Sequence, residues 1–242
     1  EEVDEALKQK LTKLMFEGPE EDLTLTENAQ PALMAVSLAC VRVLQKEGGV
    51  DFATDAQFVA GHSLGEYSAL AAAGTFELAD TARLLKTRGQ AMQAAVPVGE
   101  GAMAALLGLE LEDAQAVAEE AAQGEICTAA NDNASGQVVL SGNRAAVERA
   151  IEIASERGAR RSVLLPVSAP FHCALMAPAA DVMAEALADV KMVAPAVPLI
   201  ANVTASAQND VNEIRQLLVE QVTGMVRWRE SVLAMRDAGV DT

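Results

Sequence analysis

A serine at the centre of a Gly-His-Ser-Leu-Gly pentapeptide, residues 61–65, is the first residue of this chain whose setting suggests chemistry. When a strand precedes such a pentapeptide and a helix follows it, the sharp turn lifts the serine hydroxyl out of the sheet edge. The next backbone N–H and the helix N-terminus then point to the same place. Ser63 is therefore a candidate nucleophile and the Leu64 N–H a candidate oxyanion donor. The alternative is an ordinary glycine turn that contains a serine.

A serine nucleophile requires a base, and the chain has two histidines. His62 directly precedes Ser63, so we expect its side chain to leave on the other side of the turn and to support that turn. His172 is the remaining candidate, and it lies in a loop with two close prolines, Pro166 and Pro170. The alternative for a lone loop histidine is a solvent-exposed or hydrogen-bonded bystander, but the chain offers no second plausible base.

Arg88 is the third candidate, because it interrupts the apolar stripe of a helix predicted over residues 78–95. Leu84, Leu85 and Met92 share its helix face by their three- and four-residue spacing. One hypothesis is that Arg88 extends its charge to water or pairs with an internal carboxylate, as arginines on apolar faces usually do. The other is that its planar, permanently charged guanidinium binds the carboxylate of a ligand.

The apolar pattern predicts the elements that must position these residues. Residues 57–60 indicate a short strand before the pentapeptide, and residues 66–73 indicate a helix after it. Elsewhere in the body the pattern predicts a solvated helix and polar loop over 1–28, a mostly buried helix from Pro31 to about residue 47, a helix over 177–189, a strand near 199–203 and two helices ending near residue 239.

Residues 101–166 are expected to form a small unit of their own. The pattern predicts strands at 102–107, 126–130, 138–141 and 162–165 and helices at 112–122 and 144–157. That order, βαββαβ, is the ferredoxin-like unit. The predicted fold class is α/β, with a hydrolase-like main body that contains a parallel sheet, over residues 1–98 and 168–242, and a ferredoxin-like subdomain inserted over residues 99–167.

The charge of the chain restricts its partners. Eighteen Lys and Arg residues oppose 35 Asp and Glu residues, which gives a net charge of −17. So acidic a protein has no basic field for nucleic acid or for an anionic membrane, and we expect neither as a partner. The uncharged runs at 162–180 and 192–209 are interrupted by prolines and polar residues, so neither predicts a membrane span.

Cysteine and histidine usage restricts the cofactors and the compartment. The three cysteines form no CxxC pair, so neither a disulfide framework nor a zinc site is expected, and a reducing, cytoplasmic location fits best. Two histidines without clustered carboxylates give no metal site. No Gly-rich nucleotide fingerprint occurs, so no resident cofactor is expected.

Several longer blocks together resemble one enzyme family, the malonyl-CoA:acyl-carrier-protein transacylases. The resemblance covers nearly the whole chain, and the first and last blocks in this order around a βαββαβ unit are highly specific. The blocks are GHSLGEYSAL at 61–70, KTRG at 86–89, GAMAA at 101–105, Asn133 followed by GQVV at 136–139, and APFHCALM at 169–176.

The resemblance implies transfer of a malonyl group from malonyl-CoA to the phosphopantetheine thiol of acyl carrier protein, through an ester on Ser63. It implies that His172 acts as base and then as acid, with its imidazole oriented by the backbone carbonyl of Gln221. Arg88 matches the arginine that holds the malonyl carboxylate, which favours the ligand hypothesis above. Phe171 matches a malonyl-selective pattern that leaves little space for an α-methyl group. Malonyl-CoA and acyl carrier protein are then the partners, and the chain is expected to act as a monomer.

The sequence departs from the family at both ends, where a Gly-Gln-Gly segment that supplies the second oxyanion donor and a Gly-Pro-Gly segment are not found. We therefore expect an internal part of a transacylase with reduced activity, since one lost oxyanion donor costs about 100- to 1000-fold in rate. Two alternatives are a serine hydrolase such as a thioesterase, in which an Asp completes a triad and water accepts the acyl group, and an inactive acyl-carrier-docking domain.

A local basic surface is expected to dock the acyl carrier protein. Such proteins are typically acidic, so a chain of charge −17 can attract one only through a local patch. Residues 144–161 carry five arginines and three glutamates, a local charge of +2. The docking surface is therefore predicted there, around Arg157, Arg160 and Arg161.

Overall fold

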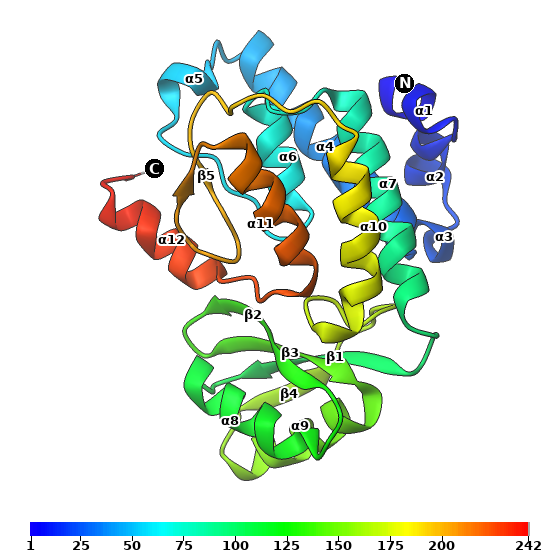
Figure 1. Ribbon diagram of the computed structural model, residues 1–242, viewed down its shortest axis with the longest axis vertical. Helices are drawn as coiled ribbons and strands as arrows, with labels where there is room; N and C mark the ends of the chain where they lie inside the picture. The colour runs from blue at the N-terminus through cyan, green and yellow to red at the C-terminus, as the bar shows by residue number, and fades with distance from the viewer. Residues whose placement is uncertain (242) are drawn as a thin grey trace.

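The computed structural model describes residues 1–241 and has a mixed α/β architecture of helices with a small antiparallel sheet. Figure 1 shows the helices of the main body above this sheet, which lies below them with its own two helices. The first seven helices are α1 (Glu2–Leu7), α2 (Leu11–Glu17), α3 (Glu20–Thr24), α4 (Thr26–Lys46), α5 (Phe52–Asp55), α6 (Gly65–Ala72) and α7 (Leu78–Ala95).

Helix α7 is the centre of the main body, where it packs against α4, α10 (Ala177–Ala188) and α1. Leu84, Leu85 and Met92 are buried in the main core, so the predicted apolar stripe is confirmed. Although α4 and α7 exceed four turns, no helix within residues 1–241 is both long enough and apolar enough to cross a membrane.

Helix α4 begins earlier than the sequence pattern indicates. The prediction that Pro31 starts the helix is wrong, because α4 begins at Thr26 and contains Pro31 in its interior. Tertiary contacts explain the difference, since the buried side chain of Gln30 in the first turns is bonded to α7. The helix is also less buried than expected, and Leu33 and Val36 on its outer face are about half exposed.

The inserted segment forms a four-stranded antiparallel sheet with the strand order β2-β3-β1-β4. Side chains alternate across it as strand geometry requires. Ala104 and Leu106 face one core with α8 and α9, whereas Met103 faces the other side, toward Phe171 of the main body. The elements are β1 (Gly101–Leu107), α8 (Leu111–Ala122), β2 (Cys127–Ala134), β3 (Gln137–Asn143), α9 (Arg144–Glu156) and β4 (Arg161–Leu164), each within a few residues of its predicted range.

The strands expected beside the pentapeptide are much shorter in the structure. The strand predicted at 57–60 is reduced to one parallel bridge between Val59 and Leu199. The strand predicted at 199–203 ends after two residues, because the Ala205 N–H donates to the Ala201 carbonyl and closes a turn. The remaining elements are η1 (Ala174–Met176), β5 (Leu199–Ile200), β6 (Ala207–Gln208), α11 (Val211–Thr223) and α12 (Trp228–Asp237).

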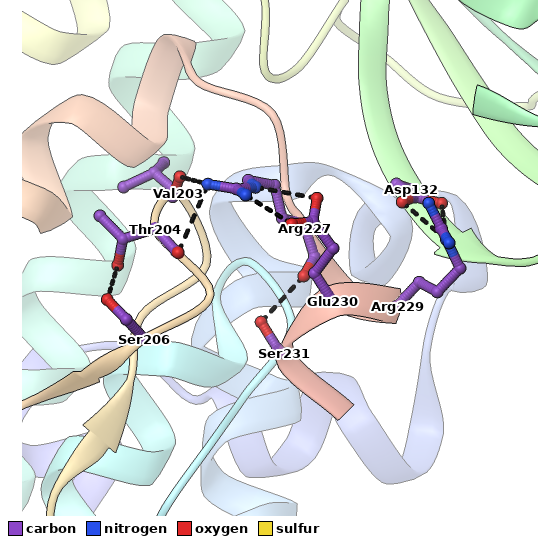
Figure 2. Close-up of polar contacts among 8 residues, drawn as sticks. All are labelled: Asp132, Val203, Thr204, Ser206, Arg227, Arg229, Glu230 and Ser231. Atoms are coloured by element: carbon purple, nitrogen blue, oxygen red, sulfur yellow. Dashed lines mark hydrogen bonds and ion pairs between the residues drawn. The ribbon is translucent and has the colours of Figure 1, made fainter. Parts of the chain in front are cut away.

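A buried ion pair joins the insert to the main body. Strand β2 has two register shifts against β3, and between them the Asp132 N–H donates to the Val226 carbonyl at 2.9 Å. Arg229 on α12 donates from Nε to both Asp132 oxygens at 2.9 and 3.1 Å, as Figure 2 shows. Arg227, the residue before α12, donates to the carbonyls of Val203 and Thr204 in the turn after β5. The start of α12 therefore holds β2 and the turn after β5 together.

Replacement of Arg229 by alanine should destabilise the protein, because it leaves the Asp132 side chain, which is 1% exposed, without its cation. Removal of one partner of a buried pair costs about 3–5 kcal/mol. Because the Arg229 side chain is 29% exposed, we expect about 2 kcal/mol in urea unfolding at pH 7. The loss should shrink in acid, where Asp132 becomes protonated and needs no cation.

The matched control is Arg236→Ala, since the Arg236–Asp237 pair is 66% and 68% exposed and should contribute less than about 0.5 kcal/mol. Equal losses in the two variants would contradict a role for the Asp132–Arg229 pair in joining the insert to the body.

Candidate active site

Ser63 lies in a tight turn that leads directly into α6. Its φ of +53° is in the left-handed region, which residues with side chains seldom adopt. A Cβ on Gly61 would lie 1.9 Å from the carbonyl oxygen of Gly65, so the first glycine allows the turn to close. Asn202 binds the turn from outside, because its Oδ1 accepts the Ser63 N–H at 2.7 Å and its Nδ2 donates to the Gly61 carbonyl at 2.8 Å.

Ser63 and His172 are brought together across 109 residues of sequence. The Ser63 Oγ lies 2.7 Å from His172 Nε2, and His172 Nδ1 lies 2.9 Å from the backbone carbonyl oxygen of Gln221. Since a carbonyl oxygen only accepts, Nδ1 carries the proton and Nε2 is free to accept the serine hydroxyl proton. His172, like Ser63, has a positive φ, of 57°. The predicted pair therefore has the geometry of a nucleophile and its base.

The imidazole of His172 is neutral at neutral pH. Burial, with a smaller contribution from the positive charge of Arg88, lowers the pKa of His172 to about 3, although the Gln221 carbonyl opposes the shift. An imidazole that stays unprotonated can receive a proton from Ser63 across the physiological range.

Arg88 is buried beside the nucleophile, with 1% of its surface exposed. Its Nη1 donates to Gln30 Oε1 at 2.7 Å, and its Nη2 donates to Gln221 Oε1 at 2.8 Å and to Ser63 Oγ at 3.1 Å. Within residues 1–241 no carboxylate accepts a hydrogen bond from this guanidinium, so the hypothesis of direct pairing with an internal acid is not supported. Burial lowers the pKa of Arg88, yet an arginine remains charged. A cation without a bonded anion thus lies next to Ser63.

The other predicted residues lie around this centre. Leu64 is the N-cap of α6, and among the described residues no acceptor binds its N–H, which leaves a free donor beside Ser63. Phe171 is half-buried and packs against both the main core and the insert cluster that contains Met103. Gln221 is fully buried on α11.

The His62 side chain leaves the turn toward the insert. Its Nε2 lies 2.9 Å from Asn133 Oδ1 on β2, and its ring centroid lies 5.5 Å from that of Trp228 on α12. Burial lowers the pKa of His62. Its contacts agree with the expectation that it supports the turn rather than serving as the base.

Sequence reasoning missed four partners of the site. Gln30, Asn202, the carboxyl of Glu66 and the side-chain amide of Gln221 all bind candidate residues or each other. Glu66 falls inside the GHSLGEYSAL block, which was a usable signal. The other three are amides in helical or turn segments, where neither periodicity nor spacing distinguishes them.

A cleft of about 480 Å³ reaches His172 from the junction of the insert and the main body. Ligand sites in proteins commonly have this size and occur between domains. A larger hollow among α1, α2 and α4 includes none of the candidate residues. The lining residues of the cleft are Thr128, Ala129, His172, Ala174, Ala177, Thr223 and Met225.

Comparisons with known proteins match this chain to acyl transferases over nearly its whole length. The model of a family described as acyl transferase domain matches residues 1–242. The malonyl CoA-acyl carrier protein transacylase of Escherichia coli K12 is 45% identical over 240 residues, 99% of this chain and 76% of that protein. The crystal structure of an acyl-carrier-protein-S-malonyltransferase from Bartonella henselae is 58% identical with a TM-score of 0.96, covering 99% of this chain and 76% of the other. A malonyl-transacylase solved in complex with its type II PKS acyl-carrier protein is 43% identical with a TM-score of 0.95, covering 99% and 76%.

The depressed pKa of His172 predicts a pH dependence of stability. The unfolded histidine titrates with a pKa of about 6.5, so below that pH the unfolded state binds one more proton than the folded state. Stability therefore falls as the pH drops from about 6.5 toward about 3, by about 1.4 kcal/mol per unit. Between pH 7 and pH 5 the wild type should lose about 2 kcal/mol more than His172→Gln in urea unfolding. The same loss in both proteins would contradict a neutral, buried His172.

Proposed function

The chain belongs to the acyl transferase domain family, whose model matches residues 1–242, and from this premise we propose that it transfers a malonyl group from malonyl-CoA to the phosphopantetheine thiol of acyl carrier protein. The observation that carries the proposal is the 3.1 Å contact between Arg88 Nη2 and Ser63 Oγ. In a malonyl thioester one methylene separates the carboxylate from the reacting carbonyl. A cation that recognises this carboxylate must therefore lie directly beside the nucleophile.

The dyad supports a two-step exchange through an ester on Ser63. His172 Nε2 accepts the hydroxyl proton as Ser63 Oγ attacks the thioester carbonyl, and the same proton then goes to the departing coenzyme A thiolate. The carrier thiol next loses its proton to His172 and attacks the ester, and Ser63 recovers a proton as it leaves. The free Leu64 N–H is placed to donate to the oxyanion of both tetrahedral intermediates. Coenzyme A is a substrate here rather than a bound cofactor.

The geometry does not favour hydrolysis as the main reaction. A hydrolase triad places a carboxylate on the second histidine nitrogen. At that position the structure has the Gln221 carbonyl, and among the described residues no acid bonds to His172. The assembled Ser63–His172 contact likewise disfavours an inert docking domain.

The same proposal includes the finer organisation of the fold. We assign residues 99–167 to a ferredoxin-like subdomain, which is supported by the βαββαβ element order and the strand order β2-β3-β1-β4. We assign residues 1–98 and 168–242 to the hydrolase-like main body, although residue 242 lies outside the described part of the chain, and the parallel Val59–Leu199 bridge beside the nucleophile turn supports this assignment.

We infer the cellular setting and the assembly state from the thiols and the site. Cys40, Cys127 and Cys173 are free thiols, which supports a reducing cytoplasmic location. All the candidate residues come from one chain, so a monomer is sufficient for the proposed reaction. Phe171, half-buried between body and insert, is proposed to limit space for a branched acyl group.

Malonyl loading of Ser63 should depend on Arg88. In Arg88→Ala, the kcat/KM for malonyl-CoA should fall about 10- to 100-fold, because hydrogen bonds to a charged group contribute about 1.5–3 kcal/mol. The kcat/KM for acetyl-CoA should change little. Intact mass after incubation with each thioester, with Ser63→Ala as the blank, measures the adduct. Arg83→Ala, an exposed position on the same helix, should load like wild type. Unchanged preference for malonyl over acetyl in Arg88→Ala would refute the assignment.

The acyl-carrier surface is proposed at Arg160 and Arg161. The structure narrows the expected patch, because Arg157 is bound in an ion pair with Glu120 and Arg149 in one with Glu125. Arg160 and Arg161 are exposed and have no ion-pair partner among residues 1–241.

The double reversal Arg160→Glu/Arg161→Glu should raise the KM for acyl carrier protein about tenfold, as expected when like charges replace attractive ones. Loading of Ser63 from malonyl-CoA should stay unchanged, which separates docking from chemistry. Arg236→Glu, at an exposed site on α12, is the control. Unchanged transfer kinetics in the double variant would place the docking surface elsewhere.

A further inference from the structure

Gln221 is bonded to all three candidate groups of the site. Its backbone carbonyl accepts from His172 Nδ1 at 2.9 Å. Its side-chain Oε1 accepts from Arg88 Nη2 at 2.8 Å, and its Nε2 donates to the Ser63 carbonyl at 2.9 Å. The position of this one buried residue on α11 therefore affects the nucleophile, the base and the cation together.

The orientation of the Gln221 amide decides whether Arg88 keeps one of its three side-chain hydrogen bonds. The two ends of an amide have nearly the same shape, but one end only accepts and the other only donates. A flipped amide would place its NH₂ against the guanidinium NH₂, and Arg88 would lose that contact. The Gln221 amide therefore needs, at its NH₂ end, a partner that can accept a hydrogen bond but cannot donate one.

The Ser63 carbonyl is one such acceptor, and the Glu66 carboxylate is the other. Its Oε2 accepts a hydrogen bond from Gln221 Nε2, and its Oε1 accepts the Asn202 N–H at 3.0 Å. Glu66 is 1% exposed, so these contacts are shielded from bulk water. An ionised carboxylate has no proton to donate, so together with the Ser63 carbonyl it keeps the NH₂ end of Gln221 on this side and the amide oxygen on Arg88.

The charges around Glu66 explain why Glu66 contacts Arg88 through Gln221 and not directly. Arg88 on α7 is the nearby cation, while Tyr67 on α6 and His172 are the other titratable groups that face this network. The segment after β5 and helix α11 contribute the uncharged Asn202 and Gln221. A direct Glu66–Arg88 pair would occupy the guanidinium with an internal anion. With Gln221 between them, the anion balances the buried cation and leaves it able to bind another carboxylate.

We propose that Glu66 is a positioning residue for malonyl recognition, which as a carboxylate fixes the Gln221 amide so that this amide holds Arg88 beside Ser63. The inference rests on the proposed function, because it concerns how Arg88 recognises the malonyl carboxylate. It adds to that function a residue that touches neither the substrate nor the reacting atoms.

The acidity of Glu66 makes this role dependent on pH. Burial raises the pKa of Glu66 to about 7, while its hydrogen bonds and the charge of Arg88 oppose the shift. Below that pH the carboxyl is protonated, its O–H competes for the amide oxygen that Arg88 uses, and the counter-charge is lost. Malonyl preference should therefore be highest above about pH 7 and decline as the pH falls through that value.

The test compares Ser63 loading from malonyl-CoA and acetyl-CoA from about pH 5.5 to about pH 8.5 in wild type and Glu66→Gln. The ratio of the two kcat/KM values cancels the titration of His172 and of the coenzyme A phosphates, which both substrates share. In wild type the ratio should fall about tenfold as the pH drops through about 7. In Glu66→Gln it should be lower by about 3- to 10-fold at high pH, mainly through the KM for malonyl-CoA, and independent of pH.

Two further variants identify the route of the effect. Gln221→Leu keeps the backbone carbonyl that His172 uses but removes the amide, so adding Glu66→Gln to it should cause no further change in the ratio. Glu152→Gln, exposed on α9, is the matched control and should keep the wild-type profile.

The outcomes separate this inference from the proposed function. A wild type that forms no malonyl adduct on Ser63 would refute the function itself. A wild type that loads normally, with a Glu66→Gln variant that keeps both its preference and its pH dependence, would overturn the role of Glu66 alone. So would additive losses in the double variant. If Glu66→Gln does not fold, Glu66→Asp is the test, because the shorter side chain keeps the carboxylate but moves it away from Gln221. A reduced malonyl preference with a retained pH dependence supports the role of Glu66. An unchanged ratio overturns it.

Discussion

The burial of one positive charge is the constraint on which the site depends. An arginine enclosed as fully as Arg88 must have its donors satisfied, and its charge balanced, by the protein or by a ligand. Here neutral oxygens from Gln30, Gln221 and Ser63 accept three of its hydrogen bonds. The Glu66 carboxylate is linked to it only through the Gln221 side chain. These partners come from three separate segments, so the fold must bring the start of α4, the nucleophile turn and α11 to α7 before the cation can be buried.

The same convergence explains where the backbone departs from regular structure. Ser63 and His172 both have positive φ values, which are uncommon for residues with side chains and cost of order 1–3 kcal/mol each. They persist because their surroundings determine them: Asn202 binds both sides of the serine turn, and the Gln221 carbonyl fixes the imidazole. The cleft that reaches His172 opens at the junction with the insert, and the contacts of β2 with α12 maintain that junction.

The local hydrophobic pattern of the sequence predicted those elements whose bounds depend on neighbouring residues. The insert elements and α7 have strong periodicity, and their predicted bounds agree with the structure to within a few residues. Ser63, His172 and Arg88 could be identified because few residues of the right type occur in suitable settings. The start of α4, the short β5 and the amides of Gln30 and Asn202 could not, because contacts with distant segments determine them. A buried amide carries no signature in its own sequence neighbourhood.

Burial has opposite effects on the two properties that the proposed reaction requires of His172. It keeps the imidazole neutral and ready to accept a proton, but a pKa of about 3 makes that imidazole a weak base. Part of the depression comes from the charge of Arg88, which a malonyl carboxylate bound to Arg88 would offset. Under the proposed function the base therefore becomes stronger when an acyl group carrying a carboxylate occupies the site, and an uncharged acyl group gives no such gain. Arg88 would then contribute to selectivity twice, once by binding the carboxylate and once through the proton affinity of His172.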